Sequence, residues 1–239
     1  MLVITGTGTG VGKTITTAAI AALALGQRQR VAVLKPAQTG VDPGEPGDLA
    51  EVERLAGPGV TTRELRRYPD PLSPEAAARR SGQPVLGPAE IASAAGELNA
   101  GHELTLVEGA GGLLVRFGPD GSGLADVAWA LGAPLVVVAE AGLGTLNATA
   151  LTAEVATRRG LNVAGVVIGS WPAVPDLAAV ENLRDLPEAA GAPLLGVLPG
   201  GLGEADRDTF AERARHGLSP WFGGEFDPET FAGSVSAQK

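Results

Sequence analysis

The sequence contains no cysteine, only two histidines (His102 and His216) and few aromatic residues. Without cysteine the chain can form no disulfide, no thiolate metal site and no cysteine nucleophile. Two histidines are too few for a histidine-based metal site. Because aromatic residues make up only 4% of the chain, a buried core must consist mostly of Ala, Val, Leu and Ile.

Long apolar runs and positive charge are also scarce. No apolar run approaches the roughly 20 residues that span a bilayer, and a strand predicted to begin at Leu2 leaves no room for a cleavable targeting sequence. The net charge of −9 disfavours non-specific attraction to nucleic acid or to an anionic membrane. We therefore expect a cytoplasmic protein with no nucleic-acid or membrane partner.

The composition is that of a globular chain, with 44% hydrophobic and 19% charged residues. A length of 239 residues permits one large α/β domain or two small ones, and no segment in the middle resembles a linker. We expect one domain over residues 1–239. The tail from about Gly217 is rich in Gly, Ser and Pro, and we assign no structure to its end.

Short apolar runs alternate with helical patterns along the chain. The predicted buried strands are Leu2–Ile4, Val31–Leu34, Leu104–Val107, Leu135–Val138, Val163–Ile168 and Leu194–Leu198. The predicted helices are Ile15–Leu25, Leu49–Leu55, Pro74–Arg80, Pro88–Leu98 and a helix that ends near Arg159. The alternation predicts a three-layer, doubly wound α/β fold with a mostly parallel sheet. In such sheets ligands bind beyond the carboxyl ends of the strands.

Prolines are expected to interrupt this pattern at two places. Pro36 cannot continue a strand ladder, so the second strand should end with Lys35 at the carboxyl edge of the sheet. From Thr61 to Pro88 the chain is broken by proline, and only the short helix after Pro74 is expected there.

A glycine-rich stretch, Gly6–Thr14, joins the first strand to the first helix. A Gly-Lys-Thr ending in this context predicts a phosphate-binding loop (P-loop), in which Lys13 reaches the phosphates and the Thr14 hydroxyl ligates Mg²⁺. The strict pattern has a glycine where this chain has Thr7, so the loop is one residue longer than the common form. The alternative is a glycine-rich turn that only joins two elements.

Charged residues follow the neighbouring strands. Glu108 fits the second Mg²⁺ ligand of such a site, although a solvated glutamate at the turn Gly109–Gly112 is the alternative. Asp48 could be a third ligand or the N-cap of its own helix, and the spacing alone favours the cap. Lys35 suggests that the acceptor of the phosphoryl group is itself an anion, although an exposed strand-end lysine fits the residues as well.

Three segments resemble the signatures of the dethiobiotin synthetase family. They are Thr5–Thr14, Lys35–Gly40 and Val107–Gly112, and Leu143–Asn147 resembles the substrate loop of that family. The matches run in order from Leu2 to about Pro199, and the longer phosphate loop is the family's form. The resemblance implies a P-loop NTPase fold of the dethiobiotin synthetase and partition-ATPase type.

The resemblance also implies a reaction. In this family a carbamate forms on 7,8-diaminononanoate from CO₂ or bicarbonate, takes the γ-phosphate, and closes to the ureido ring of dethiobiotin in biotin biosynthesis. Lys35 would hold the carbamate, and Lys13 and Thr9 would stabilise the transferring phosphoryl group. The metal ligands for Mg²⁺ would be Thr14, Asp48 and Glu108.

Further site residues carry over by the same resemblance. The implied nucleotide-binding residues are Gly8, Thr9, Gly10, Val11, Gly12, Lys13, Thr14, Ile15, Asp48, Glu108, Gly109, Ala110, Gly111, Gly169, Ser170, Pro199, Gly200 and Gly201. The implied substrate residues are Thr39, Gly111, Leu143, Gly144, Thr145, Leu146 and Asn147. In the family the substrate loop serves the neighbouring subunit, so the resemblance implies a homodimer.

The chain departs from the family at two places. Members often have an acidic residue at the position of Gly8, and many have an Asn-Asp pair, which reads adenine, where this chain has Gly169 and Ser170. Losing the asparagine amide removes hydrogen bonds that select adenine. The nucleoside triphosphate could therefore be ATP, CTP or another, and we hypothesise a relaxed preference for the base.

Two other classes of protein compete with this interpretation. Amidation enzymes of corrin synthesis share the domain, but they carry a glutaminase domain with a nucleophilic cysteine, which this chain lacks. Partition or positioning switches share the first strand and loop, but they have a signature lysine at the position of Gly8 and a basic or amphipathic anchor. A response of nucleotide hydrolysis to a diamine and bicarbonate, or instead to DNA or lipid, would discriminate them.

Overall fold

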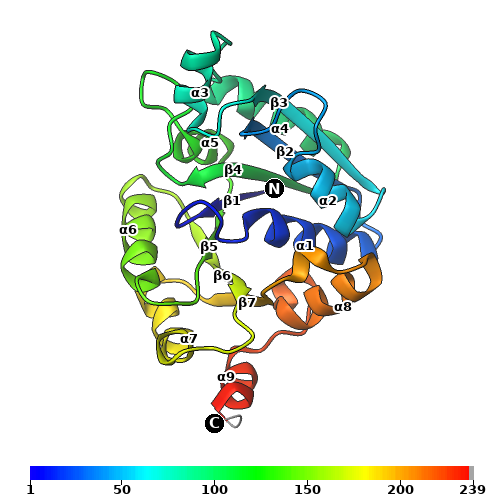
Figure 1. Cartoon of the computed structure of the whole chain (residues 1–239), viewed down its shortest axis with the longest axis vertical. Coiled ribbons are helices and arrows are strands. Elements are labelled where there is room, and N and C mark those ends of the chain that lie inside the picture. The colour runs from blue at the N-terminus through cyan, green and yellow to red at the C-terminus, as the bar shows by residue number, and fades with distance from the viewer. Residues whose placement is uncertain (237–239) are drawn as a thin grey trace.

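The centre of the molecule is a parallel seven-stranded sheet in the order β3-β2-β4-β1-β5-β6-β7 (Figure 1). The structure is a computed structural model that describes residues 1–236. The strands are β1 Leu2–Gly6, β2 Val31–Thr39, β3 Val60–Tyr68, β4 Leu104–Gly112, β5 Leu135–Ala139, β6 Val163–Trp171 and β7 Leu194–Pro199.

Helices cover both faces of the sheet, as the alternating pattern predicts (Figure 1). The longer helices are α1 Lys13–Gly26, α2 Asp48–Ala56, α3 Pro74–Ser81, α4 Pro88–Gly101, α5 Leu124–Leu131, α6 Thr145–Arg158, α7 Leu177–Ala190, α8 Arg207–Gly217 and α9 Pro228–Ser236. Two short 3-10 helices are η1 Leu202–Glu204 and η2 Pro220–Phe222. Among the described residues no helix has the length and apolar character that crossing a membrane requires.

Successive residues of each strand point to opposite faces and build separate cores. Ile4 and Val138 pack with α1, α2 and α8 on one face. Val3 and Leu135 pack with α4 and α5 on the other face. At the β6–β7 end of that second face, the strands pack with α7 and α9. The two-sided burial explains why the strands are continuous apolar runs rather than alternating ones.

The sequence prediction missed one strand, β3. Val60–Tyr68 carries Arg63, Glu64, Arg66 and Arg67, and these charges fit its place at the edge of the sheet, where it pairs with β2 alone. The prediction that the chain between Thr61 and Pro74 has no regular structure was therefore wrong.

The end predicted for β2 was also wrong. The strand runs through Pro36 to Thr39, pairing with β3 as far as Thr39↔Tyr68. Its pairing with β4 stops at Leu34↔Val107. Beyond Leu34 the strand has a partner on one side only, and a proline is tolerated where a strand is an edge. Lys35 therefore lies within the strand, at the point where β2 and β4 part.

Two more expectations need correction. Gly109–Gly112 belongs to β4, which shifts register between Ile4 and Gly6 of β1, and is not a separate turn. The chain after Gly217 forms η2 and α9, and Phe231 of α9 packs edge-on against Trp171 at 5.4 Å between ring centroids. Residues 237–239 of the predicted tail lie outside the described part of the chain.

Candidate active site

The phosphate loop, Gly6–Thr14, leaves β1 and enters α1 at the carboxyl edge of the sheet (Figure 1). Gly12 has φ +95 at the N-cap of α1, and a Cβ there would come 2.4 Å from Gly169 O. Only glycine permits both this conformation and this close approach. The side chain of Lys13 folds back over the loop, and its Nζ donates to Gly8 O at 2.8 Å. The loop has the backbone of an anion-binding site.

Lys35 lies between two carboxylates beside this loop. Its Nζ is 2.5 Å from Asp48 Oδ2 and 2.7 Å from Glu108 Oε1, and it donates to Gly109 O at 3.3 Å. The Lys35 side chain is 4% exposed. The alternative of an exposed strand-end lysine is therefore wrong. Apart from Lys239, which lies outside the described residues, Lys13 and Lys35 are the only lysines of the chain.

The charges of the two lysines are coupled. Burial lowers the pKa of Lys13, and the neighbouring Lys35 charge lowers it further against the opposing effect of Glu108 and Asp48. For Lys35 burial also favours the neutral form, but Glu108 and Asp48 outweigh it and raise the pKa above the ordinary value. Lys35 is therefore a permanent cation at neutral pH.

Asp48 does not cap its helix, so the preference drawn from spacing was wrong. α2 begins at Asp48 with Gly47 at the N-cap, and no side chain there makes a cap hydrogen bond. The Asp48 N–H donates instead to Gln38 Oε1 at 2.9 Å. At this first position of the helix the carboxylate makes no cap hydrogen bond, and it pairs with Lys35 instead.

Glu108 is buried, 1% exposed, which rules out the alternative of a solvated glutamate. Its Oε1 accepts from Thr14 Oγ1 at 3.0 Å and from Lys35, whereas its buried Oε2 has no hydrogen-bond partner. A buried carboxylate oxygen without a partner beside a threonine hydroxyl fits a divalent cation. The described residues contain no cluster of three or more His, Cys, Asp or Glu that could hold a metal alone. The donor set therefore fits Mg²⁺ held by Thr14, Asp48 and Glu108 together with phosphate oxygens, as predicted for a P-loop site.

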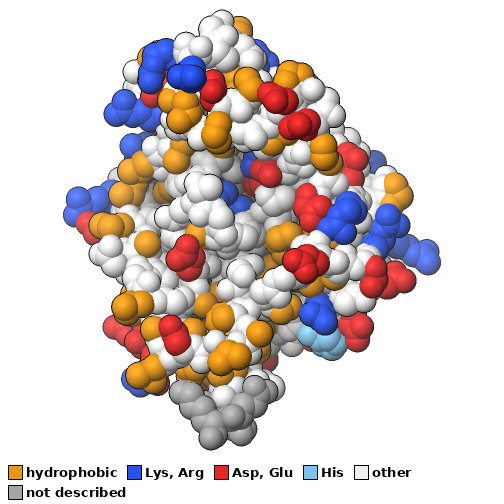
Figure 2. All heavy atoms as spheres, viewed as in Figure 1, with side chains coloured by type: hydrophobic (Ala, Val, Ile, Leu, Met, Phe, Trp, Pro, Cys, Tyr) orange, Lys and Arg blue, Asp and Glu red, His pale blue; other side chains and the backbone are white. Residues whose placement is uncertain are grey.

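These groups line one cleft of about 750 Å³. Its charged wall comes from the phosphate loop, β2, β4 and Asp48. Its apolar wall comes from Ala110, Val115 and the β3–α3 segment Pro71–Pro74. The chain after Pro74 is joined to the chain after Val115 by a hydrogen bond from Glu75 N–H to Arg116 O at 3.2 Å. Figure 2 shows a hollow near the middle of this face, with basic and acidic side chains visible inside it.

The cleft unites part of the predicted site. The predicted residues that line it are Thr9, Gly10, Gly12, Lys13, Thr14, Ile15, Lys35, Thr39, Asp48, Glu108, Ala110 and Gly111. Gly169, Ser170 and Pro199–Gly201 do not line it. They lie on the other side of the phosphate loop, where a Cβ on Gly169 would come 2.2 Å from Val11 O and Gly200 N–H donates to Trp171 O at 2.7 Å.

The predicted substrate loop, Leu143–Asn147, also stands outside the cleft of its own chain. Leu143 is 91% exposed, whereas Thr145 is buried and donates from Oγ1 to Glu140 O at 2.7 Å. Thr145–Asn147 form the first turn of α6, so only Leu143 and Gly144 of the predicted loop lie outside a helix.

The sequence prediction missed Gln38, Val115 and the wall Pro71–Pro74. The prolines were visible in the sequence, but they read only as breaks in regular structure. Gln38 lies inside the recognised segment Lys35–Gly40, and no spacing indicated that its amide would reach the start of α2.

The fold and the phosphate loop define a P-loop nucleoside-triphosphate-binding protein, and the AAA domain family matches residues 1–201. An ATP-dependent dethiobiotin synthetase from Saccharopolyspora erythraea is 65% identical over 95% of this chain and 98% of the relative. One from Streptomyces avermitilis is 59% identical over 97% of each chain. The chain belongs to the dethiobiotin synthetase family.

Solved structures with low sequence identity share the fold. The cell division ATPase MinD of Pyrococcus furiosus has a TM-score of 0.55 at 18% identity, over 100% of this chain and 99% of its own. FtsY from Mycoplasma mycoides has a TM-score of 0.58 at 15% identity, over 99% of this chain and 66% of its own. At these identities the likeness supports the architecture alone.

Proposed function

We propose that this chain is a dethiobiotin synthetase that uses a nucleoside triphosphate to close the ureido ring of dethiobiotin from 7,8-diaminononanoate and CO₂. The family membership gives the reaction. The observation that most supports this reaction at the cleft is the buried Lys35 ammonium. It lines the cleft between Asp48 and Glu108, next to the phosphate loop.

The reaction brings two anions together. One amine of the substrate takes up CO₂ and releases a proton, which gives a carbamate. A carbamate oxygen then attacks the γ-phosphorus and the nucleoside diphosphate leaves. The second amine attacks the carbamate carbon and phosphate leaves, which closes the ring. Lys13 and Lys35 stabilise this encounter, because each places a fixed positive charge in the cleft before the anions meet.

Each wall of the cleft suits one part of the substrates. The charged wall suits the phosphates and the carbamate, with Thr9 and Thr39 as further polar contacts. The apolar wall of Pro71, Leu72, Pro74 and Val115 suits the methylene chain of the diamine, because apolar surface is removed from water there.

The sheet order supports a proposed position for the nucleoside. β2 and β4, which carry Lys35 and Glu108, lie on one side of β1, whereas β6 and β7 lie on the other. A triphosphate whose γ-phosphate faces Lys35 therefore extends its base toward Gly169–Ser170 and Pro199–Gly201. Mg²⁺, held by Thr14, Asp48 and Glu108, would neutralise the phosphate charge. A homodimer, in which Leu143–Asn147 reaches the partner's cleft, completes the proposed assembly.

The test is incorporation of labelled bicarbonate into an acid-stable product. We expect incorporation that requires both the diamine and a nucleoside triphosphate, because a carbamate decomposes in acid and a ureido ring does not. Label that remains acid-labile, or nucleotide hydrolysis that ignores the diamine, would overturn the proposal.

A relaxed preference for the base is part of the proposal. Gly169 has no side chain and Ser170 has only a hydroxyl, so hydrogen bonds that select adenine are reduced in number. We expect kcat/KM values for ATP, CTP, GTP and UTP within about tenfold of one another. A kcat/KM for ATP more than roughly a hundredfold above the values for the other three nucleotides would contradict the relaxed preference.

A further inference from the structure

The β2–α2 connection, Gly40–Gly47, delivers Asp48 to the cleft. The first amides of a helix have no partner within the helix. Asp48 is the first residue of α2, after the N-cap Gly47, and its amide is satisfied from another element, since Gln38 Oε1 of β2 accepts the Asp48 N–H at 2.9 Å. Gln38 is 4% exposed, and its Nε2 donates to Thr39 O at 3.3 Å.

The contact is closely packed. A Cβ on Gly47 would come 2.8 Å from Gln38 Oε1 and 3.0 Å from Arg67 Nη2. Arg67 holds the connection from the other side: its Nη1 donates to Asp42 O at 3.3 Å and to Glu45 O, and its guanidinium pairs with Glu64 at 2.8 Å. The start of α2 is therefore fixed between β2 and β3.

We propose that Gln38 is a positioning residue for the reaction. By accepting the first N–H of α2 it fixes the backbone of Asp48, and with it the direction of the carboxylate that lies 2.5 Å from Lys35 and would hold the divalent cation. The proposal rests on the proposed function, because it assigns the cation ligand Asp48 its orientation. Groups that orient a metal ligand affect metal affinity without touching the metal.

The first test replaces Gln38 with Met, which has a similar length but no carbonyl oxygen. We expect Gln38→Met to weaken Mn²⁺ binding about tenfold, measured by electron paramagnetic resonance in the presence of a non-hydrolysable triphosphate. We expect kcat to fall by a similar factor, with KM for nucleotide at saturating metal changed less than about threefold. Gln38→Glu keeps an acceptor for the Asp48 N–H and should recover most of the metal affinity.

Two further variants separate positioning from general destabilisation. Gly47→Ala removes no functional side chain, but its Cβ would come 2.8 Å from Gln38 Oε1 and 3.0 Å from Arg67 Nη2, so it should displace the Gln38 carboxamide and weaken Mn²⁺ binding as well. Gln83→Met, at an exposed position, is the matched control and should bind Mn²⁺ like the parent. If Gln38→Met fails to fold, Gly47→Ala decides the question.

The proposal would be overturned if Gln38→Met lowered the melting temperature but left Mn²⁺ affinity unchanged. If Gln38→Met does not fold, the same result in Gly47→Ala would overturn it. Either result would show that Gln38 has a structural role only. Loss of the labelled acid-stable product in the parent protein would instead overturn the proposed function, so the two failures are distinguishable.

Discussion

Lys35 combines burial, a raised pKa and two carboxylate partners. We expect Lys35→Ala to lower kcat by about a hundredfold or more, because a fixed charge that meets the acceptor anion is lost. Nucleotide affinity should change less than about threefold. Steady-state kinetics and equilibrium binding of a non-hydrolysable triphosphate measure the two quantities.

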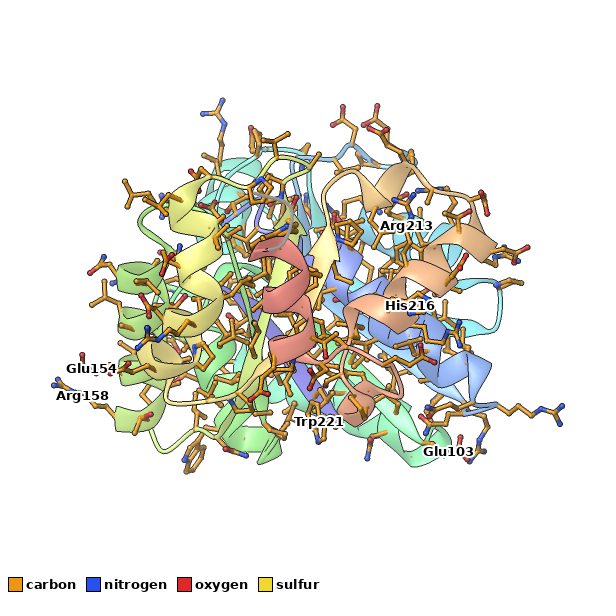
Figure 3. All side chains as sticks on the ribbon, turned by 90° about the horizontal axis from the view of Figure 1, so that it is seen from below. Glu103, Glu154, Arg158, Arg213, His216 and Trp221 are labelled. Atoms are coloured by element: carbon orange, nitrogen blue, oxygen red, sulfur yellow. The ribbon has the colours of Figure 1, made fainter. Side chains whose placement is uncertain are left out.

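The control for this variant removes a cation far from the cleft. Arg213 lies on α8 (Figure 3), is exposed and does not line the cleft, so Arg213→Ala should leave both quantities unchanged. An equal loss of turnover and nucleotide affinity in Lys35→Ala would show that Lys35 merely binds nucleotide.

Lys13 belongs to the phosphate loop, where it donates to Gly8 O at 2.8 Å. We expect Lys13→Ala to abolish turnover and to weaken triphosphate binding by about 2 kcal/mol, or roughly thirtyfold, since a charge-assisted contact disappears. Isothermal titration with a non-hydrolysable triphosphate checks this. Binding that is unchanged would mean that the loop amides alone hold the phosphates.

Many of the candidate site residues could be predicted from the sequence, but the residues that they contact could not. The pattern around Lys13 identified the phosphate loop, and Lys35 stood out as a lysine after a buried strand. The role of Asp48 could not be settled from spacing, because the helix begins at Asp48 itself, with Gly47 at the N-cap, and the Asp48 N–H bonds Gln38 of a different element. A contact between residues of separate elements depends on packing that no local pattern encodes.

At the scale of elements, an ion pair ties the beginnings of β2 and β4. Arg30 Nη2 is 2.9 Å from Glu103 Oε1, and Arg30 N–H also donates to the same carboxylate at 2.6 Å. These hydrogen bonds lower the pKa of Glu103 to about 2. Figure 3 shows Glu103 at the periphery of the molecule.

The sign of the linkage follows from this lowered pKa. A carboxyl group whose folded pKa is depressed stabilises the fold above its unfolded pKa, and that contribution disappears as pH falls through the folded pKa. We expect Glu103→Gln to lower the melting temperature at pH 7 and to have a smaller effect at pH 3. Scanning calorimetry at both pH values is the measurement.

Glu154 provides the comparison, because it makes an exposed pair with Arg158 one turn away on α6 (Figure 3). Both pairs are exposed, and such pairs contribute little. Only Glu103 also accepts a backbone N–H, from Arg30, so both shifts in melting temperature should be small and that of Glu154→Gln the smaller. An effect of Glu103→Gln that is the same at pH 7 and pH 3 would contradict the argument.

Elements buried on both faces were predictable, whereas the edge of the sheet was not. β1 and β5 could be predicted from their apolar runs, because parallel strands covered by helices on both faces are apolar throughout. β3 pairs on one side only and carries charges, so its sequence resembles a loop. β2 passes through Pro36 because its neighbour β4 diverges after Leu34, which cannot be seen from β2 alone.

At the scale of the whole molecule, the predicted substrate loop, Leu143–Asn147, does not line the cleft of its own chain. The proposed homodimer resolves this separation, since Leu143 is 91% exposed and available to a second copy. A twofold-symmetric dimer has one interface, in which each residue occurs at two equivalent positions. Each active site would then contain the phosphate loop of one chain and the substrate loop of its partner.

Mixed dimers test this arrangement. Lys35→Ala should disable the cleft. Leu143→Asp should disable the proposed substrate loop, because 7,8-diaminononanoate carries a carboxylate that an added negative charge would repel. Chains of the two kinds, co-expressed in equal amounts with different tags, form mixed dimers in half of the assemblies. One of the two sites in each mixed dimer then contains neither substitution, so the mixture should recover about a quarter of the parent activity. Mixed dimers as inactive as the two parental variants would show that the loop serves its own chain, and a protein that stays monomeric at its working concentration would remove the shared site altogether.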